Sequence, residues 1–107
     1  MSNTLQVIKS GKLLKLTLES RFGANIFQKD CFKLSDLLNY QISCKNVRVE
    51  MDGRSEPQYN VKITTKHNDY CYKNIANAEA VDISLDVILG EQNILPKNDY
   101  INDGNGN

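Results

Sequence analysis

The sequence predicts an α+β fold with five or six mostly antiparallel strands and one principal helix packed on the sheet, in a single domain. Three observations support this class. Several segments alternate between apolar and polar residues, which is typical of strands with one buried face. One segment has apolar residues at helical spacing instead. The length of 107 residues, with 40% apolar and 24% charged residues, fits one globular core.

The first predicted element is a β-hairpin near the N-terminus. Residues 4–9 and 12–20 both alternate, and the Ser-Gly pair between them contains a glycine that can adopt the positive φ of a tight turn. With this pair as the loop, Val7 lies opposite Leu14. The hairpin then has one apolar face, which consists of Leu5, Val7, Leu14, Leu16 and Leu18.

A helix is expected between residues 27 and 41, because Phe27, Cys31, Leu34 and Leu38 have the spacing of one helix face. Such a helix would pack on the apolar face of the hairpin. Alternatively, Ser35-Asp36 caps a shorter helix that begins at Leu37, with residues 32–34 extended before it.

Two further strands are predicted at residues 46–51 and 59–66. Pairing Val49 with Val61 gives a consistent apolar face, and it also places Val47 opposite Ile63 and Met51 opposite Tyr59. A turn at residues 67–69 leads to another short strand at residues 70–73. Residues 74–80 are ambiguous between a helical turn and the approach to the next strand.

The last predicted strand covers residues 81–89 and ends at Gly90. Alternation places its apolar residues in the core and exposes an acidic face with Asp82 and Asp86. The segment after it is too apolar for a free tail, so the domain is expected to cover residues 1–101. Residues 102–107 contain only Asn, Asp and Gly and are expected to fray. The residues expected to dock are Ile94, Leu95, Tyr100 and Ile101.

The predicted order strand-strand-helix-strand over residues 4–51 resembles the opening of ubiquitin-like β-grasp domains. The resemblance concerns the order of elements alone. The sequence ends Gly104-Asn105-Gly106-Asn107 and lacks the terminal Gly-Gly that this family uses for conjugation. No function of the family is therefore expected here.

Few residues could support catalysis or metal binding. His67 is the only histidine, and its use as a base for Cys71 requires contact between side chains four positions apart in a strand or turn. We therefore expect no catalytic residues. Cys31, Cys44, His67 and Cys71 lack the close ligand pairs of structural zinc sites. We expect reduced, buried thiols and neither a metal nor another cofactor.

Charge is unevenly distributed along the chain, although the net charge is zero. Residues 1–75 contain 12 Lys or Arg against seven Asp or Glu, whereas residues 76–107 contain Lys97 against six acidic residues. No apolar run is long enough to span a bilayer, and the first four residues lack the features of a secretion signal. A cytoplasmic location without membrane contact is therefore expected.

These features favour a non-enzymatic protein-binding inhibitor. Its most concrete form is a cytosolic bacterial immunity protein that neutralises a toxin nuclease by covering the basic active-site cleft. The predicted partner-binding residues are Asp82, Asp86, Glu91, Asp99 and the aromatic anchor Tyr100. The alternative is a small nucleic-acid-binding or phage accessory protein, with a basic sheet surface formed by Lys62, Lys66, Lys73, Tyr70 and Tyr72.

Overall fold

The computed structural model contains two β-sheets and an α-helix, and it describes residues 3–20, 25–48, 53, 55–92 and 100–102. The first sheet has the order β1-β2-β3, and the second has the order β6-β5-β4-β7. All pairings are antiparallel except that of β7, which runs parallel to β4. The elements are β1 (Asn3–Ser10), β2 (Leu13–Ser20), β3 (Ile26–Lys33), the 3-10 turn η1 (Leu34–Asp36), β4 (Leu37–Arg48), β5 (Ser55–Thr65), β6 (Asp69–Tyr72), α1 (Ala78–Glu91) and β7 (Tyr100–Asn102).

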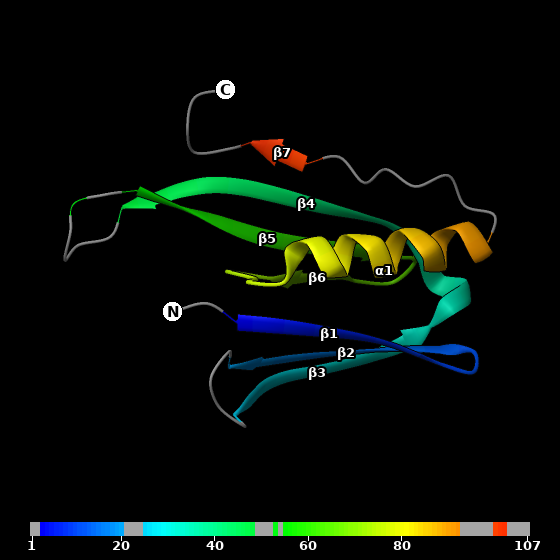
Figure 1. The fold of residues 1–107 in the computed structure, drawn as a ribbon. Coiled ribbons are helices and arrows are strands. Elements are labelled where there is room, and N and C mark those ends of the chain that lie inside the picture. The colour runs from blue at the N-terminus through cyan, green and yellow to red at the C-terminus, as the bar shows by residue number, and fades with distance from the viewer. Residues whose placement is uncertain (1–2, 21–24, 49–52, 54, 93–99, 103–107) are drawn as a thin grey trace.

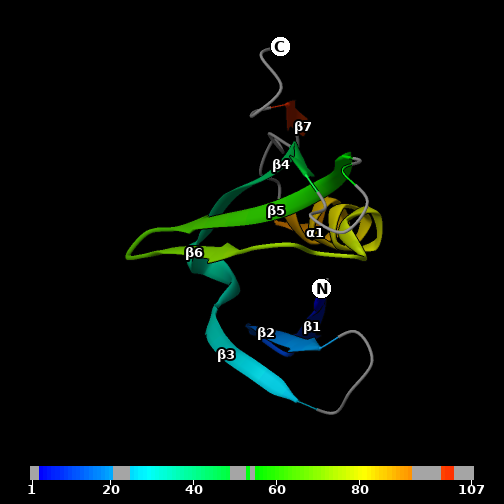
Figure 2. The ribbon, with the colours of Figure 1, turned by 90° about the vertical axis from the view of Figure 1, so that its left-hand side faces the viewer.

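The two sheets and α1 surround one core (Figures 1 and 2). The first sheet lies below the second in Figure 1, η1 joins them, and α1 lies beside both β1 and the second sheet. Each part contributes buried side chains, for example Leu16 from β2, Ile63 from β5 and Leu85 from α1. The α+β class is therefore confirmed, but the described residues form seven strands in two sheets and not five or six strands in one.

The predicted face of the first hairpin is confirmed, but its register is wrong. Leu5 pairs with Leu18 and Val7 with Leu16, so the loop consists of Gly11 and Lys12. Gly11 has a φ of +60°, which suits the first central position of a two-residue hairpin loop. Because the shift is two residues, the same side chains still face the core.

The helix predicted between residues 27 and 41 is wrong, as is the shorter helix from Leu37. This segment forms β3, η1 and the first part of β4. Two residues of the supposed apolar helix face, Cys31 and Leu38, are exposed, whereas Phe32 and Leu37 are buried. Pairing of β3 with β2 and of β4 with β5 therefore overrides the local spacing. The predicted order strand-strand-helix-strand, which resembled β-grasp domains, is therefore wrong, because a strand follows the first hairpin where the helix was expected.

The predicted pairing of the next two strands is also wrong. Ile42 pairs with Val61 and Tyr40 with Ile63, while Val47 lies opposite Glu56. The cause is that β4 begins at Leu37, well before the predicted start, and its buried alternation lies in that earlier part. The predicted residues 49 and 51 lie outside the described residues. The short strand predicted at residues 70–73 is confirmed as β6.

The strand predicted over residues 81–89 is wrong, because these residues belong to α1. Both alternation and helical periodicity are present in this segment. The helix buries Val81, Leu85, Ile88 and Leu89, which are spaced i, i+4, i+7 and i+8. Ile83 and Val87 are 60% and 56% exposed, although alternation assigned them to the core.

Residues 100–102 form β7 beside β4, with Ile42 opposite Tyr100 and Cys44 opposite Asn102. Asn102, which the sequence assigned to the tail, is thus the last residue of this strand. Ile94 and Leu95, which were expected to dock, lie outside the described residues, as do residues 103–107.

Candidate functional site

Asp82 and Asp86, which alternation assigned to a strand face, lie on the helix α1. Asp82 is half-buried and accepts a hydrogen bond from the Tyr40 hydroxyl, whereas Asp86 is exposed. The Glu91 carboxylate lies 2.6 Å from Lys9 Nζ. Asp99 lies outside the described residues, and Tyr100 is placed in β7, although its side chain is not described. The structure therefore brings Asp82, Asp86 and Glu91 onto one element.

The exposed side of α1 combines apolar and acidic residues. Ile83 and Val87 are one helical turn apart, and the exposed Glu79 and Asp86 lie beside them by helical periodicity. We call these four residues the α1 face. A pair of exposed apolar side chains with charged residues at its margin has the anatomy of a protein interface.

Another segment of the chain forms main-chain hydrogen bonds with part of the edge of β1 that does not pair with β2. The Asn3 N–H donates to the Asn74 carbonyl at 2.8 Å, and the Ala76 N–H donates to the Asn3 carbonyl at 2.7 Å. Asn74 has a φ of 58°, a conformation that asparagine tolerates better than most residues. Residues 74–76 therefore lie beside Asn3, in a parallel bridge through Ile75. We call each position of β1 whose N–H and C=O groups point away from β2 a rung, so Asn3 is the first rung.

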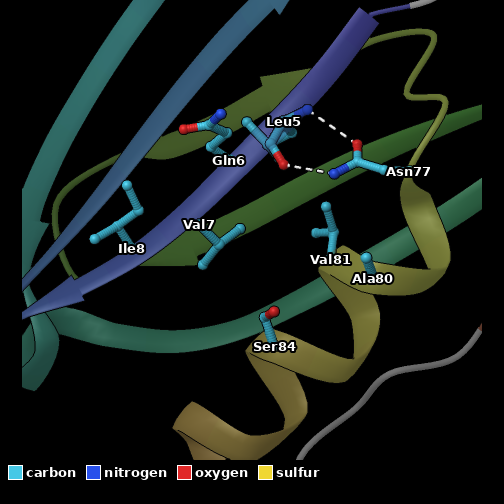
Figure 3. Close-up of a pocket in the computed structure, with 8 residues that line it drawn as sticks. All are labelled: Leu5, Gln6, Val7, Ile8, Asn77, Ala80, Val81 and Ser84. Carbon is cyan, nitrogen blue, oxygen red and sulfur yellow. Dashed lines mark hydrogen bonds between the residues drawn. The ribbon is translucent and has the colours of Figure 1, made fainter.

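The next rung is filled by one side chain, that of Asn77. The Leu5 N–H donates to Asn77 Oδ1 at 3.0 Å, and Asn77 Nδ2 donates to the Leu5 carbonyl at 2.9 Å (Figure 3). The Asn77 amide thus offers one acceptor and one donor, as a residue of a neighbouring strand would. Both main-chain groups of Leu5 must point away from β2 to make these contacts.

The next rung, at Val7, is open, which means that its N–H and C=O groups form no hydrogen bond with any described residue. Alternate residues of an antiparallel strand direct their N–H and C=O groups to opposite sides, so Val7 and Lys9 follow Leu5 in pointing away from β2. Within the described part of the chain, no hydrogen bond fills this outer rung at Val7. The main-chain groups of Val7 are therefore available for pairing.

A hollow of about 290 Å³ lies next to this open rung, between β1 and α1 (Figure 3). We call it the β1–α1 groove. One wall consists of residues 5–8, and the other consists of Asn77, Ala80, Val81 and Ser84. The helix presents the small side chains of Ala80 and Ser84 here, one turn apart, which leaves space beside Val7. Figure 3 shows the Val7, Val81 and Ser84 side chains extending into the gap between the two elements.

Two contacts bridge β1 and α1 on either side of Val7. The Asn77 amide holds Leu5 on one side, and the ion pair of Lys9 with Glu91 joins the far ends of the two elements. Both side chains of this ion pair are partly exposed. Glu91, in the last turn of α1, is therefore held by Lys9 of β1. The roles of Asn77 and Lys9 could not be predicted from sequence, because their partners are 72 and 82 positions away in the chain.

The two aromatic residues of the basic surface in the alternative hypothesis, Tyr70 and Tyr72, pack in or against the core. Tyr72 is buried and its hydroxyl donates to Asp30 Oδ2 at 2.7 Å. Burial, and next this hydrogen bond, raise the pKa of Tyr72. The Tyr70 ring stacks on Phe32, with 5.2 Å between the centroids. The three lysines are exposed, and Lys62 Nζ lies 3.7 Å from an Asp69 carboxylate oxygen.

The cysteines are free thiols, but the expectation that they are buried is wrong. Cys31 and Cys71 are exposed and Cys44 is half-buried. Among the residues that the structure describes, no three His, Cys, Asp or Glu side chains gather in a way that could hold a metal ion. His67 is exposed, with Nε2 3.9 Å from an Asp36 carboxylate oxygen.

Comparison with known proteins gives no relative from which a function could be taken. No protein-family model matches the chain, and no curated protein or solved structure matches it either. In the described ranges, no helix has both the length and the apolar character needed to cross a membrane.

Proposed function

We propose that this protein is a non-enzymatic domain that binds another protein through the β1–α1 groove and the adjoining α1 face. The open rung at Val7 is the observation that supports this function best. A strand edge with free N–H and C=O groups can pair with an extended segment of a second chain. The chain's own residues already occupy the preceding rungs, at Asn3 and Leu5, in this manner.

The α1 face supplies the side-chain part of the proposed interface. Ile83 and Val87 give it an apolar centre, and the residues that contribute most of the binding energy cluster near the centre of an interface. Glu79 and Asp86 at its margin favour a basic partner, chiefly by accelerating association.

The most concrete form of this proposal is an immunity protein that neutralises a toxin nuclease in the bacterial cytoplasm. A nuclease cleft is basic because it binds phosphates, so it is complementary to the carboxylates of the α1 face. In this form, a segment of the toxin adds to β1 while the acidic side of α1 faces the basic cleft.

The test uses a proline at Val7, since proline lacks the N–H group and is tolerated on edge strands where that group does not serve the sheet. The Val7→Pro variant should fold but fail to bind. Lys29→Pro is the matched control, because the main-chain groups of Lys29 also point away from β2, on the other edge strand, β3. Folding of both variants is checked by circular dichroism and thermal unfolding.

The protein encoded by the adjacent reading frame is the partner to test first, because an immunity gene is expected next to its toxin gene. We expect the unmodified protein and Lys29→Pro to bind this product and block its nuclease activity, and Val7→Pro to do neither. A folded Val7→Pro variant with full affinity would contradict strand addition at β1. Binding to single-stranded DNA with a steep salt dependence, and to no protein, would favour the nucleic-acid alternative.

A further inference from the structure

A second hollow, of about 530 Å³, lies where the β1–β2 turn, η1 and the last turn of α1 meet. These three segments lie at the same end of the molecule (Figure 1). We propose that this hollow, which we call the lysine pocket, binds a small organic molecule that carries a phosphate group. This inference does not depend on the proposed function, because neither the groove nor the α1 face contributes to it.

Three lysines line the lysine pocket. They are Lys9, Lys12 and Lys33, and among the described residues no Asp or Glu belongs to the lining. Lys9 forms an ion pair with Glu91, just outside the lining. Lys12 and Lys33 form no ion pair with any residue of the described ranges. Two lysines without an ion-pair partner among the described residues therefore line the same hollow.

These two charges favour a phosphate over a singly charged anion. A phosphate monoester carries a charge of about −1.5 to −2 near neutral pH and offers three acceptor oxygens. It can thus accept hydrogen bonds from both ammonium groups at once, and charge-assisted bonds of this kind are stronger than neutral ones.

The main chain fixes the positions of these lysines before a ligand arrives. The Leu34 N–H donates to the Lys12 carbonyl at 2.9 Å, which ties the hairpin turn to η1. Lys33 lies opposite Leu13 in the pairing of β2 with β3. A site on such preformed elements loses little entropy when it binds a ligand.

The rest of the lining suits the organic part of the ligand. Leu13 is 38% exposed and offers an apolar wall together with Leu34. The Ser35 hydroxyl and the Gln92 amide can each donate or accept a hydrogen bond. The volume falls within the range of about 300 to 1,000 Å³ that is usual for small-molecule sites. An inorganic phosphate ion would leave most of this volume and the apolar wall unused.

The outer side of the first sheet extends the positive charge beyond the pocket. Lys15 and Lys29 are exposed and occupy the same side of the sheet as Lys33, because alternate residues of a strand share a face. Grouped charges of one sign raise the local concentration of oppositely charged ligands. The pocket therefore lies at the end of a basic surface, on a protein without net charge.

The proposal is tested by titrating the protein with AMP, phenyl phosphate and glucose 6-phosphate, and by following amide chemical shifts. Adenosine and inorganic phosphate are titrated in parallel. We expect at least one monoester to bind saturably, with the largest shifts at Gly11, Lys12 and Ser35. Inorganic phosphate should bind more weakly, and adenosine should not bind. If no monoester binds below about 10 mM, or if adenosine binds equally well, the proposal is wrong.

The variant Lys12→Ala/Lys33→Ala identifies the site. It should lower the affinity at least about tenfold, since each charge-assisted hydrogen bond to the phosphate is a strong one. Lys66→Ala/Lys73→Ala is the matched control, because it removes the same charge from exposed lysines outside the lining, and it should change the affinity less than about twofold. Equal losses in the two variants would show general charge attraction instead. Binding of a DNA oligonucleotide without any monoester would likewise contradict a small-molecule site.

Discussion

At the scale of single residues, Asn77 has the most specific structural role. It precedes α1 in the position of an N-terminal cap, but its side chain forms no cap hydrogen bond and binds the main chain of Leu5 instead. The two residues are 72 positions apart in the sequence. One amide thus fixes the distance between β1 and the start of α1, and with it the width of the β1–α1 groove.

Replacing Asn77 with Ala should lower the free energy of unfolding by about 1 to 2 kcal/mol. The change removes two hydrogen bonds from partly buried main-chain groups, each worth roughly 0.5 to 1.5 kcal/mol. Urea unfolding measures the loss. Asn46→Ala, at an exposed position of β4, serves as the control and should stay within about 0.5 kcal/mol of the unmodified protein. Equal stability of all three proteins would contradict the role of Asn77.

Tyr72 makes the stability depend on alkaline pH. Burial, and next the hydrogen bond to Asp30, raise its pKa above the ordinary value of 10.0 in the folded chain. The unfolded chain ionises this hydroxyl near pH 10, whereas the folded chain keeps the proton. The stabilisation is therefore complete below pH 10 and is lost as the pH rises further.

This predicts a steeper fall in unfolding free energy from about pH 9 to about pH 11 for the unmodified protein than for Tyr72→Phe. The two proteins differ at no other titratable group, so the difference between the two curves isolates Tyr72. Parallel curves would mean that the hydroxyl titrates in the folded protein as it does in the unfolded one.

At the scale of elements, the face of the first hairpin could be predicted from sequence, whereas α1 could not. Residues 81–89 satisfy both the strand and the helix pattern, which differ in where they place Ile83, Val87 and Ile88. A strand would expose Ile88 with the acidic residues, but the helix buries it. The choice depends on whether α1 can pack against β1 and β4, which are distant in sequence.

Two alanine substitutions separate these alternatives in solution. A strand would place Ile83 and Leu85 on the same buried face, so both changes would cost similar energies. In α1, Leu85→Ala should lower the unfolding free energy by about 2 to 5 kcal/mol because it leaves a cavity. Ile83→Ala should change it by less than about 0.5 kcal/mol, since the side chain is exposed. Similar losses at both positions, measured by urea unfolding, would contradict the helix.

The wrong prediction of a helix in the segment that forms β3 and the start of β4 has a different physical cause. The inner face of β3 contains Gln28 and Asp30, so its alternation is too weak to reveal a strand. Asp30 is accommodated there because it accepts the hydrogen bond from the Tyr72 hydroxyl, on a strand of the other sheet. Local sequence patterns do not contain such contacts. The candidate site was even less predictable, because the groove depends on residues 74–77 lying beside β1.

At the scale of the whole molecule, the two sheets and α1 share one core, and charge is divided between surfaces. Carboxylates gather on α1, and lysines gather on the outer side of the first sheet and around the β1–β2 turn. The acidic character of residues 76–107 could be seen from the sequence, but the placement of Glu79, Asp82, Asp86 and Glu91 on one helix could not. The proposed interface and the lysine pocket therefore differ in sign of charge.

Because the core is shared, a cavity in the first sheet should destabilise the entire protein. Leu16→Ala should lower the unfolding free energy by about 2 to 5 kcal/mol, in a single transition seen alike by circular dichroism and tyrosine fluorescence. Two separate transitions, with only one shifted by the substitution, would indicate that the sheets fold independently.

Amide hydrogen exchange along β1 tests the central claim, the open rung at Val7, most directly. The amides of Gln6 and Ile8 point toward β2, and that of Leu5 is bound by Asn77, so all three should exchange slowly. The Val7 amide should exchange at least about a hundredfold faster than its neighbours, and it should become protected when the partner binds. A free protein in which Val7 is protected as strongly as Gln6 and Ile8 would contradict an open edge and, with it, the proposed mode of binding.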